Sequence, residues 1–145
     1  MKEQYYKILE SLDKLTDLPK LFFRLILAYG FYEPAMKKVG NIDAIAGWFA
    51  SMNFPAPALN AYLAAGIEFA GFILLFLGLG TRLISIPLII VMLVAIFTVH
   101  LGNGFAAGEN GFEIPLYYLL MLFSLLISGA GKISLDYIIR GKLKK

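Results

Sequence analysis

The chain has 145 residues, of which 59% are hydrophobic and 16% are charged, and its formal net charge is +3. With a mean hydropathy of +0.75, it is too apolar for a water-soluble domain of this size and is typical of a small polytopic membrane protein. The absence of cysteine excludes disulfides, thiolate metal ligands and a thiol nucleophile. The basic residues flank apolar runs, which argues against nucleic-acid binding and for membrane anchoring.

Four apolar segments approach the length of roughly 20 residues that a membrane-spanning helix needs. They run over residues 21–36, 59–79, 83–99 and 114–130. Arg24 interrupts the first segment, and the fourth begins with a proline that a first helical turn accepts. We therefore predict an all-α membrane protein that forms a four-transmembrane-helix bundle over residues 21–131, within a single domain of residues 1–145.

The segments outside the bundle are predicted to lie at the membrane surface. Residues 1–20 form an amphipathic cytoplasmic lead with apolar residues at helical spacing, which suits either a helix on the inner leaflet or a solvated helix. Residues 42–52 predict an extracytoplasmic interfacial helix, with Trp48 at the depth of the lipid headgroups. Residues 132–145 form a basic cytoplasmic tail.

The lysines and arginines outside the apolar segments predict the orientation. Nearly all of them precede the first segment, lie in the turn over residues 78–82 or follow the fourth segment, and only Lys37 and Lys38 fall on the other side. The positive-inside rule then places both termini and the turn in the cytoplasm. Two longer loops, over residues 37–58 and 100–113, face the opposite side.

Two charged residues lie inside the apolar segments. Glu68 is about 15 Å along the helix from the outer end of the second segment, and Arg24 enters from the inner side. A lone charge near the bilayer midplane costs at least about 2.5 to 3.5 kcal/mol, so each should find a partner. We predict that Arg24 and Glu68 pair, because the guanidinium fork suits a carboxylate. The pair is either a structural clamp or a group that carries protons or contacts a ligand.

A second polar set is predicted at one level near the outer surface. Its members come from the ends of antiparallel helices: Glu33, Lys37, Lys38, His100 and Glu113. His100 is the only histidine, which excludes a multi-histidine metal site, and we assign no metal. It is either an acid–base group beside carboxylates, a weak metal ligand, or an interfacial residue that caps the third helix. A cavity lining or an aromatic belt would explain the nearby tyrosines Tyr29, Tyr32, Tyr117 and Tyr118.

Several stretches of the chain resemble the successive signature segments of the DoxX family of small four-helix integral membrane proteins. The strongest are EFAGFILLFLGLGTR at residues 68–82, VHLGNGF at residues 99–105 and GAGKISLD at residues 129–136. With RLILAYGFYEPAMKK at residues 24–38, the resemblance extends over most of the chain. Recurrent polar residues of the family are matched by Arg24, Glu68, Arg82 and His100.

The resemblance implies a multi-pass protein of the bacterial or archaeal cytoplasmic (inner) membrane that is linked to redox chemistry. Relatives include the membrane subunit of thiosulfate:quinone oxidoreductase and a partner in a membrane-associated oxidoreductase complex that handles thiols. We therefore expect a quinone-linked oxidoreductase, or the membrane subunit of a redox complex, that acts on sulfur or thiol compounds. Its expected cofactor is a noncovalent quinone, and its expected partners are a redox protein and the lipid bilayer.

The expected site residues follow from these two polar sets. The expected catalytic residues are His100, Glu33 and Glu68, the cofactor-binding residues Arg24, Tyr32 and Tyr117, and the substrate-binding residues Lys37 and Lys38. The alternative is a non-catalytic membrane anchor or scaffold for a soluble redox or maturation partner. A small transporter is disfavoured because the chain shows no repeat symmetry.

Overall fold

The computed structural model describes residues 2–143, and every regular element in that range is a helix. The elements are α1 (Lys2–Asp13), α2 (Asp17–Gly40), α3 (Ile42–Ser51), α4 (Pro57–Leu77), α5 (Thr81–Ala95), the π-helix η1 (Ile96–His100), the 3-10 helices η2 (Leu101–Asn103) and η3 (Ala107–Glu109), α6 (Glu113–Ser128) and α7 (Leu135–Leu143). The all-α prediction is confirmed for these residues. The four predicted apolar segments fall on α2, α4, α5 with η1, and α6.

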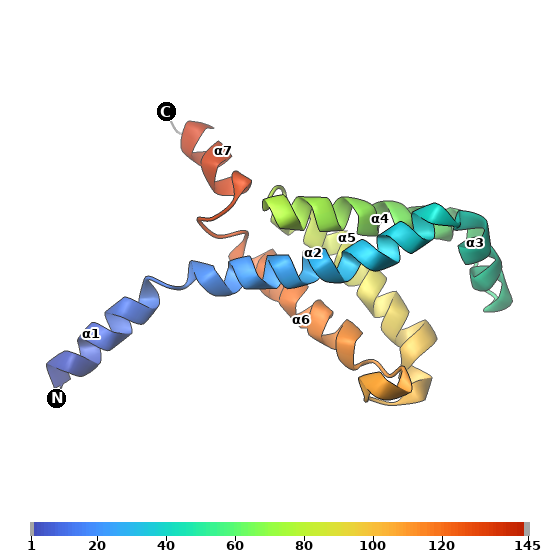
Figure 1. The fold of residues 1–145 in the computed structure, drawn as a ribbon, viewed down its shortest axis with the longest axis horizontal. Helices are drawn as coiled ribbons and strands as arrows, with labels where there is room; N and C mark the ends of the chain where they lie inside the picture. Colours follow the sequence, from blue (N-terminus) through green and yellow to red (C-terminus); the bar gives the residue numbers. More distant parts are fainter. Residues whose placement is uncertain (1, 144–145) are drawn as a thin grey trace.

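α2 is longer than the first predicted segment, which stopped at residue 36 before two lysines. The helix continues to Gly40 and carries Lys37 and Lys38 in its last turn. A mid-helix proline usually kinks or ends a helix, but Pro34 lies inside α2 and does not end it. α1 contains no buried residue and projects away from the bundle beyond the start of α2 (Figure 1).

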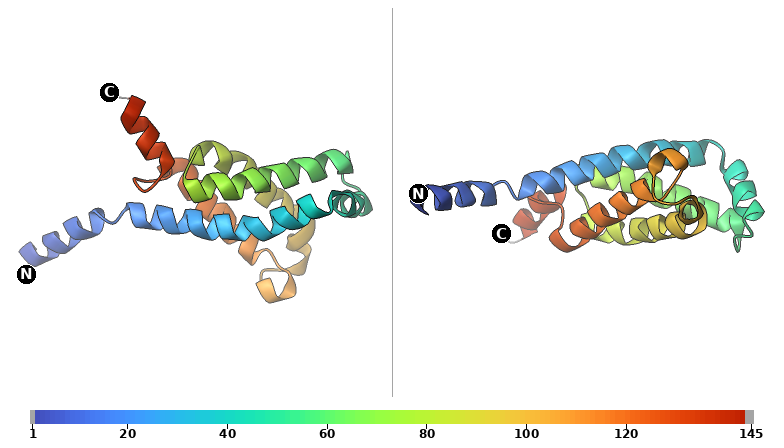
Figure 2. Two further views of the ribbon diagram at one scale, coloured as in Figure 1. Left: turned by 45° about the horizontal axis from the view of Figure 1, so that its top comes forward. Right: turned by 90° about the horizontal axis from the view of Figure 1, so that it is seen from below.

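The two ends of the bundle are built differently. At one end, which we call the turn end, α4 and α5 are joined by a tight turn in which Gly78 and Gly80 adopt left-handed backbone angles, with φ of 66° and 58°. A Cβ at Gly78 would overlap the Arg24 guanidinium, so glycine is required there. α3 crosses the opposite end, which we call the α3 end, and both chain termini lie toward the turn end (Figure 2).

The helices pack in two main pairs, α2 on α4 and α5 on α6. α4 also packs on α5, where Gly71 allows a close approach because an added Cβ would press against the Leu88 side chain. The buried hydrophobic core joins all four helices through Leu27, Ala28, Phe31, Leu75, Ile84, Leu88, Met92, Leu122 and Leu125.

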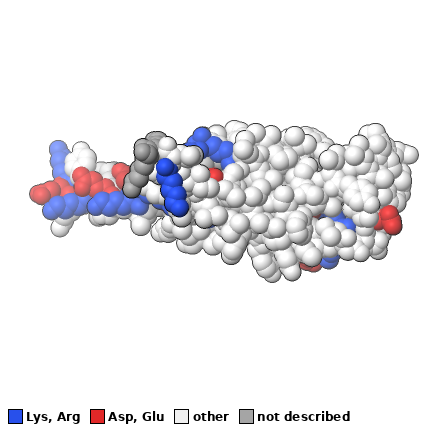
Figure 3. All heavy atoms as spheres, turned by 90° about the horizontal axis from the view of Figure 1, so that it is seen from above, with Lys and Arg blue, Asp and Glu red and all other residues white. Residues whose placement is uncertain are grey.

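The outer surface of the bundle is as apolar as its core. Leu83, Phe97 and Ile127 are 76%, 67% and 63% exposed. On the face that Figure 3 shows, charged side chains gather toward the turn end, a smaller group lies near the opposite end, and the body between them is uncharged. Among the described residues, α4 and the continuous helical run Thr81–Asn103 are long and apolar enough to cross a membrane, and α6 is apolar but shorter. Exposed apolar surface on this scale marks a surface that contacts lipid or protein.

Candidate functional site

A pocket of about 400 Å³ lies among α2, α3, α4, α5, η1 and α6, toward the α3 end of the bundle. Its volume falls within the range of small-molecule sites. The charged side chains that line it are Lys38 and Glu68, and His100 lines it as well. We call it the Glu68 pocket; its mainly apolar and aromatic walls include Phe31, Trp48, Phe49, Ile67, Val91 and Tyr118.

The ion pair of this pocket joins Lys38 to Glu68. The Lys38 Nζ donates to Glu68 Oε2 at 2.7 Å, and the side chains of the two residues are only 17% and 5% exposed. Lys38 comes from the last turn of α2 and Glu68 from the middle of α4. An ammonium group has three donors, so Lys38 can hold Glu68 and still donate to a second acceptor in the pocket.

The predicted pair between Arg24 and Glu68 is wrong. Arg24 is buried, but its Nε donates to the Leu75 carbonyl at 3.1 Å, and its Nη1 donates to the carbonyls of Ala130 and Ile133, both at 2.8 Å. Leu75 lies about two helical turns, or roughly 10 Å, from Glu68 along α4. Three carbonyls at the turn end therefore occupy the guanidinium, and Glu68 is left to the long side chain of Lys38, which reaches it from the other direction.

His100 reaches the pocket from an irregular part of its helix. α5 changes from α- to π-helix at Ile96, and His100 is the last π-helical residue; such π segments are frequent at functional sites. The His100 Nδ1 lies 2.8 Å from the Asn110 carbonyl, which also accepts from the Asn103 amide at 3.1 Å. Because a carbonyl only accepts, Nδ1 carries the proton and Nε2 is the nitrogen available to a ligand. His100 thus binds the following loop instead of capping its helix.

The other predicted site residues do not line the Glu68 pocket. Glu33 and Lys37 form an exposed ion pair of 2.6 Å on α2. The Tyr32 ring packs edge-on against Phe72, with a centroid distance of 5.4 Å. Tyr117 donates to Glu113 Oε1 at 3.1 Å, and Glu113 Oε2 accepts from the backbone N–H of Ala107 at 2.9 Å. The structure therefore brings together Lys38, Glu68 and His100 and leaves Arg24, Glu33, Lys37, Tyr32 and Tyr117 outside.

Tyr118, one of the tyrosines for which a cavity lining was an alternative, lies in the wall of the pocket beside Gly30. The Tyr118 ring packs against Phe31, with a centroid distance of 5.6 Å. Its hydroxyl lies directly over Gly30, where an added Cβ would overlap it. Gly30 lies inside a helix, where glycine is unfavourable. A glycine in the middle of an apolar helical segment was therefore the signal in the sequence that another side chain packs closely there.

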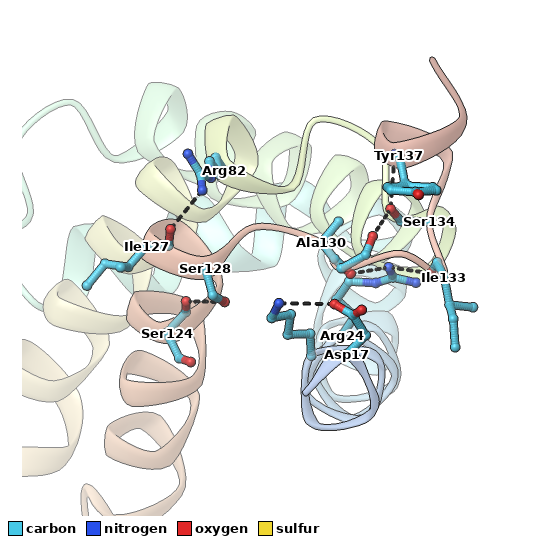
Figure 4. A network of polar contacts seen from close by, with 12 residues as sticks. Asp17, Arg24, Arg82, Ser124, Ile127, Ser128, Ala130, Ile133, Ser134 and Tyr137 are labelled. Atoms are coloured by element: carbon cyan, nitrogen blue, oxygen red, sulfur yellow. Dashed lines mark hydrogen bonds and ion pairs between the residues drawn. The ribbon is translucent and has the colours of Figure 1, made fainter. Parts of the chain in front are cut away.

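The turn end holds a second polar network, shown in Figure 4. Besides the three bonds of Arg24, the Asp136 carboxylate accepts from the N–H groups of Gly80 and Thr81 at 2.8 and 3.1 Å and so caps the start of α5. The Lys20 ammonium, 3.1 Å from the Asp17 carboxylate, lowers the pKa of that carboxyl. The segments 68–82 and 129–136, in which the family resemblance is strong, therefore contact each other at the turn end. Their hydrogen bonds there connect α2, α4, α5 and α7.

Metal binding by side-chain clusters has no basis in the part of the chain that the structure describes. Over residues 2–143, no group of three or more His, Asp or Glu residues is placed to hold an ion. The titratable side chains that line the Glu68 pocket include an ammonium, a carboxylate and an imidazole.

Comparisons with known proteins identify the family of the chain. The DoxX family model matches residues 20–101. A Haemophilus influenzae protein named "Uncharacterized protein" is 34% identical over 128 residues, which cover 83% of this chain and 82% of the relative. The Bacillus subtilis (strain 168) protein named "Putative oxidoreductase CatD" is 30% identical over 134 residues, or 90% of this chain and 95% of the relative. No solved structure matches the chain. The chain belongs to the DoxX family of membrane proteins.

Proposed function

We propose that this protein binds a quinone in the Glu68 pocket and serves as a quinone-linked oxidoreductase, or as the membrane subunit of a redox complex that acts on sulfur or thiol compounds. The observation that carries the proposal is a mainly apolar pocket of about 400 Å³ that contains one buried ion pair and one histidine. A relative named as an oxidoreductase supports the same class of reaction.

The residues of the pocket fit the two halves of a quinone. Its aromatic and aliphatic walls suit the ring and the isoprenoid chain, and its few donors suit the carbonyl oxygens. Lys38 can donate through the hydrogens that Glu68 does not use. His100 presents Nε2 because Asn110 holds Nδ1. We therefore assign Lys38 to the quinone and not to a soluble sulfur anion; Lys37, which lies outside the pocket, keeps the latter role.

When bound, a quinone supplies an acceptor for two electrons and two protons. The protein's own part is to position the ring and to hold protons beside it. Glu68 balances the charge of Lys38, His100 exchanges a proton at Nε2, and the apolar walls exclude water. The electrons come from the sulfur or thiol compound, directly or through a redox partner. The chain has no cysteine that could relay them.

The membrane arrangement belongs to the same proposal. α2, α4, α5 with η1, and α6 form four spans in the cytoplasmic (inner) membrane, with the turn end and both termini in the cytoplasm and the α3 end outside. The distribution of lysine and arginine supports this orientation. It is tested with single cysteines in a chain that has none: those at Asp43 and Glu109 should be labelled from outside intact cells, and those at Glu10 and Lys142 should be protected. The reverse pattern would overturn the orientation.

The test of the redox role has two steps. Protein purified in mild detergent should retain quinone that solvent extraction releases, and membranes should reduce added quinone when given thiosulfate or a small thiol. Glu68→Gln should abolish that reduction, whereas Glu33→Gln, outside the pocket, should leave most of it. Equal activity in both variants would remove the Glu68 pocket from the reaction.

One observation favours a second candidate, a membrane anchor for a soluble partner. α1 projects from the bundle (Figure 2) and exposes Tyr5, Tyr6, Ile8 and Leu12. If anchoring is the whole function, deleting residues 2–13 should release a stoichiometric partner from isolated membranes. The Glu68→Gln variant should then keep the partner and the phenotype of the native pathway.

A further inference from the structure

A second cavity, of about 330 Å³, lies at the turn end, opposite the Glu68 pocket. It is formed by the start of α5, the end of α6, the loop over residues 129–134 and α7. We call it the turn-end pocket. The proposed redox function makes no use of it, although the residues that carry the family resemblance converge on it.

The cations and carboxylates of this pocket are not equally matched. Asp17 is held by Lys20, and both oxygens of Asp136 are held by backbone N–H groups. Three cations also line the pocket, and among the described residues none of them lies within ion-pair distance of a carboxylate. They are Arg82, Lys132 and Arg140. Because three cations and two carboxylates line the pocket, and Lys20 pairs with Asp17, the pocket carries net positive charge that can attract an anion.

Arg82 is fixed in a position that leaves donors free. Its Nη2 donates to the Ile127 carbonyl at 2.8 Å (Figure 4), and the neighbouring Gly129 leaves room for the guanidinium, because an added Cβ would lie 3.2 Å from its Nε. A guanidinium has five N–H donors, and this hydrogen bond uses only one. Arginine held in this way suits a phosphate group, whose oxygens accept two parallel bonds.

One side of the pocket is apolar and opens onto the outer face of α5. Leu83 lines the pocket and is 76% exposed. Ile86 and Ile90 are also exposed and follow it at helical spacing on the same face. A ligand that places an anionic group among the three cations can therefore extend a hydrocarbon chain along α5. Free phosphate would use only the first of these features.

We propose that the turn-end pocket binds the phosphate group of an anionic phospholipid headgroup. The cations provide the charge, Arg82 provides the directed donors, and Leu83 begins the track for an acyl chain. The site lies at the end of the bundle where the charged surface begins (Figure 3), which is the depth at which headgroups lie. Only its assignment to the inner leaflet depends on the orientation proposed above.

The test uses full-length protein in detergent and measures thermal protection by dioctanoyl phosphatidylglycerol. Lys132→Gln/Arg140→Gln is the informative variant, because within residues 2–143 neither side chain forms an ion pair that the fold would lose. Lys14→Gln/Lys142→Gln removes the same charge outside the pocket and is the control. We expect the lipid concentration for half-maximal protection to rise about 30-fold in the first variant, at about fivefold per cation, and to change little in the second.

Two further ligands identify the source of the phosphate group. Dioctanoyl phosphatidylcholine should protect less than phosphatidylglycerol, because its choline cation faces the three cations. Inorganic phosphate should give little protection, because it leaves the Leu83 side empty. Equal protection by inorganic phosphate, lost in the Lys132→Gln/Arg140→Gln variant, would overturn the lipid assignment and make the site one for soluble phosphate. Equal loss in both double variants, or no loss in either, would overturn the pocket itself.

Discussion

The molecule buries charged side chains at both ends of the α2–α4 pair, and the two places differ in what surrounds the charge. At the turn end, Arg24 is enclosed by backbone and gives hydrogen bonds to three carbonyls from two distant segments. At the Glu68 pocket, a lysine and a carboxylate pair beside a cavity that the core does not fill. The first charge is satisfied by the fold, and the second still has donors and an acceptor to offer a ligand.

The surroundings of a buried charge distinguish a structural charge from one that can bind a ligand better than its depth along the helix does. Sequence position alone gave Arg24 and Glu68 the same interpretation, since both are ionisable residues inside apolar segments. Their partners distinguish them. A guanidinium that donates to carbonyls joins segments of the chain, whereas an ion pair that lines a cavity can change partners when a ligand binds. The predictions below test this division in order of expected effect on stability.

Removing the Arg24 guanidinium should have the largest effect. In Arg24→Leu, the carbonyls of Ala130 and Ile133 lose their Arg24 donor, at about 1 to 2 kcal/mol for each group, whereas the Leu75 carbonyl keeps the Gly78 N–H. Unfolding followed by the fluorescence of Trp48 in detergent should show a loss of roughly 2 to 4 kcal/mol in the free energy of unfolding, from the sum of the first two terms. Lys14→Gln, on the exposed lead, should show no loss. A thermally normal Arg24→Leu protein would contradict the structural role.

The Lys38–Glu68 pair should show coupling that the Arg24–Glu68 combination lacks. Lys38→Met alone leaves a buried carboxylate without its partner, whereas Lys38→Met with Glu68→Leu replaces the pair by apolar groups, which is often tolerated. A double-mutant cycle on unfolding free energies should give a coupling of about 1 to 3 kcal/mol. The matched cycle with Arg24→Leu and Glu68→Leu should be additive. The opposite result would restore the pairing first predicted from the sequence.

Gly30→Ala should disturb the Glu68 pocket through Tyr118. The new Cβ would displace the tyrosine ring, and overpacking of this kind costs about 1 to 3 kcal/mol. Quinone retention should fall with it, because Tyr118 lines the pocket. Gly66→Ala on α4 is the control, since a Cβ there meets nothing within 4 Å. Equal behaviour of the two variants would show that Tyr118 does not set the shape of the pocket.

His100→Gln should change stability least and activity strongly. The side-chain amide can still donate to the Asn110 carbonyl, so the free energy of unfolding should change by no more than about 0.5 kcal/mol. Glutamine cannot exchange a proton as imidazole does, so quinone reduction by membranes should fall to background. Full activity would leave His100 as a residue that only holds the loop over residues 101–112. A destabilised protein would indicate a structural role.

The helices of this fold could be predicted from the sequence, and most of the side-chain contacts could not. Apolar length located the four helices, because hydropathy reports burial or lipid contact directly. It ended the first helix too early, because the charged Lys37 and Lys38 still belong to the last turn of α2. α7 was not predicted, because the tail was judged by its charge, although Asp136 connects that segment to the bundle through Gly78, Gly80 and Thr81.

The candidate site could be predicted only in part. Glu68 and His100 stood out as rare residue types in apolar surroundings, and both line the pocket. Lys38 was predicted to lie near the outer surface and to bind the substrate, but its long side chain reaches inward to Glu68. Whether Arg24 or Lys38 meets Glu68 depends on three carbonyls that compete for the guanidinium, and two of these belong to residues about a hundred positions away. Spacing along the chain carries no information about that competition.

The central claim, that the Glu68 pocket is a quinone site, is tested most directly by the fluorescence of Trp48. It is the only tryptophan in the chain and it lines the pocket, so a bound short-chain quinone should quench it. We predict saturable quenching by ubiquinone-1 in the wild type and in Lys37→Met, and binding weaker by about tenfold or more in Lys38→Met, the effect of losing one hydrogen bond to a charged donor. Unsaturable quenching that is the same in all three proteins would contradict the account.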